Sequence, residues 1–202
     1  MNKPQPDHDP TIQHFHQWVK RSRSMGSGDA QVNCNCPFLP YLELENYFGD
    51  HYRVQKLLRA LFRDRAESPV GPDEIRENYS KVFFILLLIG KGCYIEHFVH
   101  HDDLRDQHLP LKTPPESFPI APTDPNFFDS FYQKQWEFCA PIFLDNMNKI
   151  FGDREVLPIT HKERLRTGGS ATTFKIILHP YYNQLTPKRN TEEVHEIPYS
   201  LT

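Results

Sequence analysis

The chain has 202 residues, of which 38% are apolar and 13% aromatic, and its formal net charge at pH 7 is -3. This length suffices for one domain and a small second one, and the apolar content excludes a wholly disordered chain. The slightly acidic balance argues against a nucleic-acid partner, and the longest apolar run, VFFILLLI, is too short to cross a membrane.

No apolar stretch of signal-peptide length occurs near the N-terminus, and the four cysteines are too sparse and uneven for a disulfide framework. These features predict a soluble intracellular protein, cytoplasmic or nuclear. Residues 1–33 are polar and interrupted by Pro, Ser and Gly, so we predict a mostly disordered tail there. Phe15, Trp18 and Val19 form at most one short amphipathic turn within it.

Residues 34–153 are predicted to form a helical domain. In HYRVQKLLRALFRDR, apolar residues recur at helical spacing, and the arginines and the lysine lie on the opposite face. Pro72 begins a further helix with acidic residues in its first turn. The run 82–89 is apolar on all sides, which indicates a buried central helix that ends at Gly90.

After a short helix in YIEHFVHHDDL, residues 109–125 are rich in proline. Proline forbids regular helix and removes hydrogen-bond donors, so we expect an extended strap on the surface of the helices. Helical character resumes over 127–148, where Pro141 should kink or split the helix. Residues 156–159 and 172–178 have the pattern of strands on either side of a glycine pair.

The stretch ERLRTGGSATTFKIILHP holds this pair, Gly168 and Gly169. Glycines let backbone N–H groups approach phosphates, and a glycine turn between strands is the layout of a flap over a nucleotide. It is not a P-loop, because the GK[ST] ending is absent and a strand pattern follows. It corresponds to the first hairpin of a protein kinase, G-x-G-x-x-G-x-V, with the glycine slots at Arg166, Gly168 and Ala171. The candidate nucleotide-binding residues are therefore Gly168, Gly169 and Ala171.

Several longer stretches extend this likeness: FILLLIGKGCYIEHFVHHDDLRDQHLPL, FFDSFYQKQWEFCAPIF, GDREVLPITHKERL and GGSATTFKIILHPYYNQL. Through them the chain resembles a family of fungal protein-kinase-like proteins, over residues 34–185 and most specifically over 136–180. The resemblance implies an α+β fold, mainly α. A helical N-terminal domain would precede a C-terminal two-stranded antiparallel hairpin, residues 154–185, similar to kinase strands 1 and 2, with 186–202 a loose tail.

A kinase needs a third-strand lysine, a catalytic-loop aspartate and a metal-binding DFG aspartate. No lysine follows Lys188, the sequence holds no HRD or DFG tripeptide, and Lys175 falls on the second strand. The resemblance therefore implies a truncated, pseudokinase-like protein without catalysis that acts as a regulatory or interaction module. Its partner would be another protein or the missing kinase lobe. ATP and Mg are implied only for a full-length relative, and this chain would hold no cofactor.

Three alternatives stay open. The chain could be an independent helical adaptor that binds a protein through an apolar patch on its helices. It could instead be the N-terminal fragment of an active ATP-dependent Ser/Thr kinase. The third alternative is a thiol or metal enzyme. In HFVHHDD, His97, His100 and His101 could share a metal ion. Cys34 and Cys36 could also be ligands, but they are closer together than zinc ligands usually are. We favour simpler interpretations: HFVHHDD is an exposed polar helix end, and Cys93 is an inert thiol.

Overall fold

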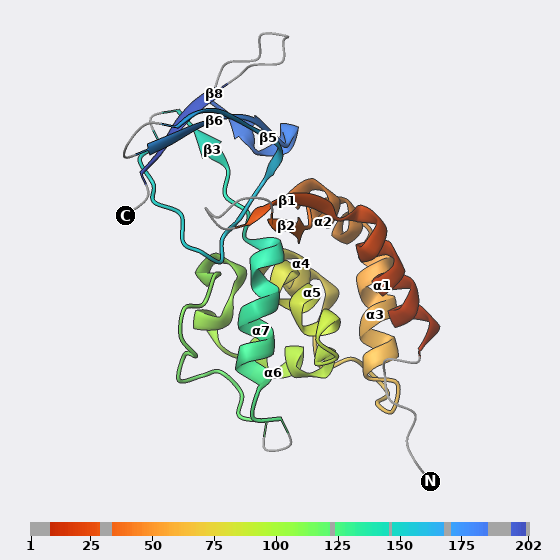
Figure 1. Cartoon of the computed structure of the whole chain (residues 1–202). Helices are drawn as coiled ribbons and strands as arrows, with labels where there is room; N and C mark the ends of the chain where they lie inside the picture. The colour runs from red at the N-terminus through yellow and green to blue at the C-terminus, as the bar shows by residue number, and fades with distance from the viewer. Residues whose placement is uncertain are drawn as a thin grey trace. The chain divides into compact units, whose positions relative to one another are not determined.

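The computed structural model describes residues 9–28, 34–121, 124–145, 147–167, 171–185 and 195–200. These residues form seven α-helices and eight β-strands, a mixed α+β fold as predicted (Figure 1). The chain divides into two compact units. The helical unit comprises Met1–Arg23 and Leu39–Cys139, and the sheet unit comprises Ser24–Phe38 and Ala140–Thr202.

The helical unit is built around one apolar helix. Its helices are α1 (Pro10–Ser22), α2 (Tyr41–Gly49), α3 (His51–Leu61), α4 (Pro72–Asn78), α5 (Ser80–Leu88), α6 (Ile95–Phe98) and α7 (Phe127–Gln135). The α5 helix contacts α2, α4, α6 and α7, and its side chains from Val82 to Leu87 are at most 2% exposed (Figure 1). The prediction of a buried central helix is therefore confirmed.

Gly90 ends α5 as predicted, and it does so with φ at 70°, a value that favours glycine. The Gly90 N–H donates to Leu87 O at 3.2 Å and the Lys91 N–H donates to Leu86 O at 2.7 Å. These two bonds satisfy carbonyl groups that the end of the helix would leave without partners.

The α1 helix is not part of a disordered tail, so the prediction for residues 1–33 is wrong over Pro10–Ser22. The Asp9 carboxylate accepts a hydrogen bond from the Thr11 N–H at 2.8 Å and caps the helix, and Pro10 occupies its first turn. Three side chains on one face are almost fully buried: Ile12, Phe15 and Val19. This polar segment is ordered because that narrow stripe completes the core, where the Phe15 ring lies 4.8 Å from the Phe84 ring.

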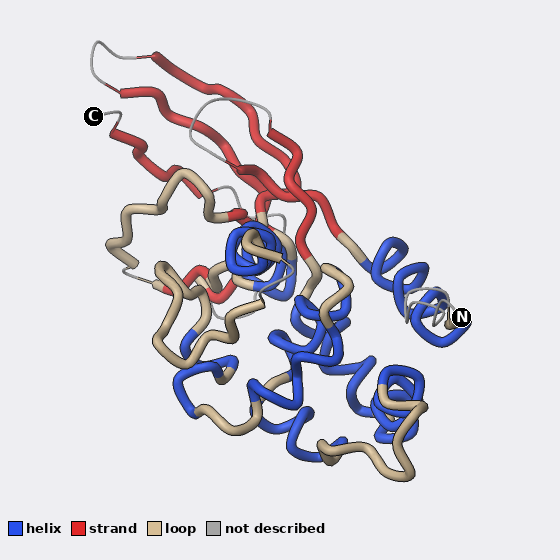
Figure 2. Tube along the Cα trace, turned by 90° about the horizontal axis from the view of Figure 1, so that it is seen from below, coloured by secondary structure: helices blue, strands red, loops and turns tan. Residues whose placement is uncertain are grey.

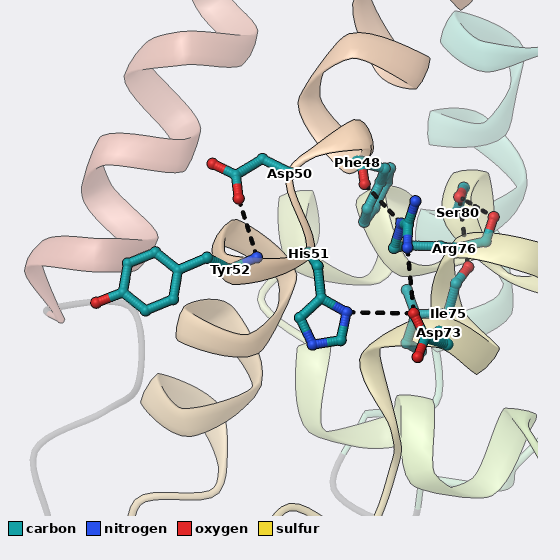
Figure 3. A network of polar contacts seen from close by, with 8 residues as sticks. All are labelled: Phe48, Asp50, His51, Tyr52, Asp73, Ile75, Arg76 and Ser80. Carbon is teal, nitrogen blue, oxygen red and sulfur yellow. Dashed lines mark hydrogen bonds and ion pairs between the residues drawn. The ribbon is translucent and has the colours of Figure 1, made fainter.

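A polar network holds the ends of α2, α3 and α4 together (Figure 3). The Asp50 carboxylate accepts from the Tyr52 N–H at 3.0 Å and caps α3. Arg76 of α4 donates from Nε to the Phe48 carbonyl at 2.8 Å and from Nη1 to Asp73 Oδ1 at 3.1 Å. His51 is the first residue of α3, and its Nδ1 lies 3.2 Å from the same Asp73 oxygen.

The described part of the proline-rich strap, 109–121 and 124–125, contains no helix or strand, in agreement with the prediction. Gln135, which is fully buried, fastens it to α7. The Gln135 amide accepts from the Leu111 N–H at 2.7 Å and donates to the Leu111 carbonyl at 2.9 Å. Phe118 adds an apolar anchor, with its ring 5.6 Å from that of Phe131.

The predicted helix over 127–148 is shorter in the structure. The α7 helix ends at Gln135, one 3-10 turn follows over Trp136–Phe138, and residues 139–140 before Pro141 are in neither helix nor strand. Proline disfavours helical backbone at the residue before it, so the helix ends ahead of Pro141 instead of being kinked there. The boundary between the two units accordingly follows Cys139, whereas the sequence placed it at 153.

The sheet unit contains three small sheets (Figure 2). Its strands are β1 (Ser24–Gly28), β2 (Cys34–Phe38), β3 (Phe143–Leu144), β4 (Val156–Leu157), β5 (Ile159–Thr167), β6 (Ala171–Leu178), β7 (Asn183–Gln184) and β8 (His195–Ser200). The sheet orders are β2-β1-β4, β3-β7 and β5-β6-β8, and only the β3–β7 pair is parallel among these described strands.

Two predictions for this unit need correction. The hairpin is not two-stranded, because β8 pairs antiparallel with β6 from Ala171↔Ser200 to Ile176↔His195, within the tail predicted to be loose. Residues 24–28, assigned to the disordered tail, form β1, which pairs with β2 and β4. In both places a strand without a strong pattern of its own is fixed by hydrogen bonds to neighbouring strands.

Candidate functional site

Strands β5 and β6, which flank the glycine pair in the sequence, form an antiparallel hairpin, as predicted. They pair from Ile159↔Leu178 to Thr167↔Thr172, and the register shifts at two irregular positions. Gly168 and Gly169 lie outside the described residues, whereas Ala171 is the first residue of β6.

The two faces of this hairpin differ. On the inner face Ile159, Ile176 and Leu178 are buried, and Phe174 packs against the same small core. The Lys162 ammonium lies 4.1 Å from the centroid of the Phe174 ring, where partial burial lowers the pKa of the lysine below its usual value. On the outer face Ile177 is 44% exposed, opposite the exposed His161.

Lys175 lies on β6 and is paired with Glu163 of β5, so opposite charges face each other across the two strands. The third strand of this sheet, β8, has the sequence HEIPYS and carries neither lysine nor arginine. A kinase holds its nucleotide phosphates with a third-strand lysine. The strand beside the hairpin, β8, therefore supplies no lysine of this kind.

Exposed apolar side chains gather in the sheet unit. Nine large hydrophobic residues among the described positions are exposed, and seven belong to this unit: Met25, Ile142, Leu144, Ile150, Leu165, Ile177 and Tyr181. The helical unit contributes the other two, Tyr52 and Ile120. Exposed apolar side chains mark surfaces that bind other proteins when they form one contiguous patch.

Two of the side chains considered as metal or thiol sites, His97 and Cys93, have structural contacts. His97 Nε2 lies 2.8 Å from the Ser117 carbonyl, and the Ser117 hydroxyl donates to Asp103 at 2.6 Å, so both hold the strap. The thiol of Cys93 lies 3.6 Å from the Leu61 carbonyl. Within the described ranges no group of three or more His, Cys, Asp or Glu side chains is arranged to hold a metal ion.

Comparison with known proteins gives no relative: the chain matches no family model, no curated protein and no solved structure. The resemblance to protein-kinase-like proteins over residues 34–185 thus stays a prediction. No α-helix in the part of the chain described here has both the length and the apolar character that a membrane crossing requires.

A pocket in the helical unit was not anticipated from the sequence. It lies between α3 and the segment that leads into α4, and three arginines line it: Arg59, Arg63 and Arg65. The sequence assigned these arginines to the solvated face of a helix. The available signal was their continuation past the end of α3 into the Ser-Pro-Val-Gly-Pro break at 68–72.

Proposed function

We propose that the chain is a non-catalytic interaction module of a protein-kinase-like family, which binds a protein partner or a separate kinase lobe through its sheet unit. In this proposal the helical unit is the regulatory extension, and the β5–β6 hairpin corresponds to kinase strands 1 and 2. The intracellular location predicted from the sequence, cytoplasmic or nuclear, is part of the same proposal.

The concentration of exposed apolar side chains in the sheet unit carries the proposal. The buried cluster of this unit is small: Phe143, Leu157, Ile159, Ile176 and Leu178. Ile177 and Leu165 are 44% and 43% exposed on the strands of the hairpin itself. If a partner covered these side chains, each Å² of apolar surface that it buried would stabilise the complex by about 25 cal/mol. A unit with a small core gains most from such burial.

The same observation favours this function over the helical adaptor. An adaptor that binds through its helices needs an apolar patch on them, yet the helical unit exposes only Tyr52 and Ile120 among its described large hydrophobic residues. The sequence of β8 argues against the alternative that the chain is a fragment of an active kinase, because β8 places no lysine beside the hairpin.

Titration with Mg·ATP, followed by thermal unfolding, tests the non-catalytic half of the proposal. At 10 mM nucleotide, a Kd of 1 mM would stabilise the folded state by about 1.4 kcal/mol, which raises Tm by a few degrees. We expect no such shift. Stabilisation of that size or larger would show that the hairpin binds nucleotide and would overturn this half.

A matched pair of variants tests the interaction half. Ile177→Asp places a charge on the outer face of the hairpin, and Ile120→Asp makes the same change on the helical unit, where Ile120 is 90% exposed. The tagged chain is isolated from its source cells after cross-linking, and recovery of the co-purified partner is compared. We expect Ile177→Asp to abolish recovery and Ile120→Asp to leave it unchanged; the reverse result would support the helical adaptor.

A further inference from the structure

The arginine-lined pocket of the helical unit has a volume of about 710 Å³. Its floor is apolar and formed by three buried side chains: Leu58, Phe62 and Val70. Its rim is polar, with Gln55 and Arg59 from α3 and with Arg63, Arg65 and Glu67 from the following segment. An apolar floor with a few charged groups above it is the usual composition of a ligand site.

The surface around the pocket is basic although the chain as a whole is acidic. Residues 50–67 carry five arginines and lysines and three acidic residues, and Glu96 pairs with Arg65, so the local net charge is +1, whereas the formal charge of the chain is -3. The pocket lining alone contains three arginines against Glu67. The field at this face therefore favours an anionic ligand.

Contacts on both sides fix the shape of the pocket. Arg65 is held by Glu96 through two parallel hydrogen bonds, each of 2.8 Å, and its guanidinium lies 5.2 Å from the Phe62 ring centroid. On the other side, Pro72 precedes Asp73, which receives contacts from α3 and from Arg76 (Figure 3). The Ser68 hydroxyl donates to the Val70 carbonyl at 2.8 Å and closes the turn between these two sides. A site held this way loses little conformational entropy when a ligand binds.

One cation remains available on this rim. Arg65 is committed to Glu96, but Arg59 is exposed and forms no ion pair with any residue that the structure describes. Arg59 lies in the last turn of α3 and lines the pocket, so its guanidinium can reach a ligand bound there.

We propose that this pocket binds a short acidic peptide segment of a partner protein. An apolar side chain of the peptide would fill the floor at Leu58, Phe62 and Val70, and a flanking carboxylate would meet Arg59. The apolar floor favours a peptide over a free inorganic anion. The same apolar floor disfavours nucleic acid, whose phosphates form a continuous line of charge. The site lies in the helical unit and does not depend on the interaction proposed for the sheet unit.

Fluorescence anisotropy with a defined probe tests this site. The probe is a fluorescein-labelled nonapeptide with a central leucine flanked by glutamates, titrated with the full chain at about 50 mM salt, where exposed charges are weakly screened. We expect saturable binding that weakens as salt is raised. Exchange of the glutamates for lysines should abolish it, and exchange of the leucine for serine should weaken it.

The matched variants are Arg59→Glu in the pocket and Lys56→Glu outside its lining, on the same helix. Both residues are exposed, so neither substitution disturbs the core, and circular dichroism verifies the fold. We expect Arg59→Glu to weaken binding about tenfold, or about 1.4 kcal/mol, and Lys56→Glu to weaken it less than about threefold.

Three results would overturn the proposal. The first is the absence of saturable binding of the glutamate peptide. The second is an equal loss of affinity in the two variants, which would show attraction to general positive charge instead of to the pocket. The third is stronger competition by a short DNA duplex than by unlabelled peptide, which would assign the face to nucleic acid.

Discussion

Replacement of Gln135 by leucine should destabilise the helical unit by about 3 kcal/mol. The Gln135 amide is the partner of both the N–H and the carbonyl of Leu111, at 2.7 and 2.9 Å, and its side chain is fully buried. Each backbone group left without a partner costs roughly 1–3 kcal/mol. The two together cost about 2–6 kcal/mol, and the extra apolar burial of leucine offsets about 1–2 kcal/mol of this.

Urea denaturation followed by circular dichroism measures the loss, and Gln133→Leu is the matched control. Gln133 lies on the same helix but is exposed, so its substitution should change the free energy of unfolding by no more than about 0.5 kcal/mol. Hydrogen exchange at the Leu111 amide provides a local readout, since that proton should lose protection when its acceptor is removed.

Equal stability of the two variants would refute the reasoning, because it would mean that the amide of Gln135 does not fasten the strap. Unchanged protection of the Leu111 amide in Gln135→Leu would refute it independently of the global stability.

Two further predictions concern α5 and β1. Asp106 accepts hydrogen bonds from two backbone N–H groups at the start of α5, but its burial outweighs them and raises the pKa of the carboxyl to about 6. Because the folded state binds this proton more tightly than the unfolded state, stability should fall by about 2 kcal/mol as pH rises from 4 to 7; Asp106→Asn should remove this part of the pH dependence in urea titrations. A Cβ at Gly26 would collide with the Leu157 carbonyl, so Gly26→Ala should lower the stability of the sheet unit by about 1–3 kcal/mol, while Gly152→Ala, where the space is open, should leave its thermal unfolding unchanged.

The sequence predicted those elements whose signals are local. The apolar run of α5, the proline at the start of α4 and the face of α3 each specify their structure within one segment, and all are found. The hairpin around the glycines is found for the same reason, since β6 alternates between buried Ile176, exposed Ile177 and buried Leu178. Alternation of apolar and polar residues along one segment is enough to indicate a strand.

Other elements depend on pairing or packing with segments outside themselves. Strand β1, SMGSG, has no alternating apolar pattern and is ordered by pairing with β2 and β4. Strand β8 contains a proline, Pro198, and is fixed by pairing with β6. The pocket at Arg59 was missed for a related reason: the arginines were visible in the sequence, but the return of Val70 and Pro72 beside them depends on the fold.

The central claim is that the sheet unit is the surface by which this chain binds a partner, and photo-crosslinking tests it most directly. A benzoylphenylalanine at position 177 is compared with one at position 120, since Ile177 and Ile120 are both exposed but belong to different units. The account predicts a discrete cross-linked partner from position 177 and none from position 120. Cross-linking from position 120 alone would contradict it.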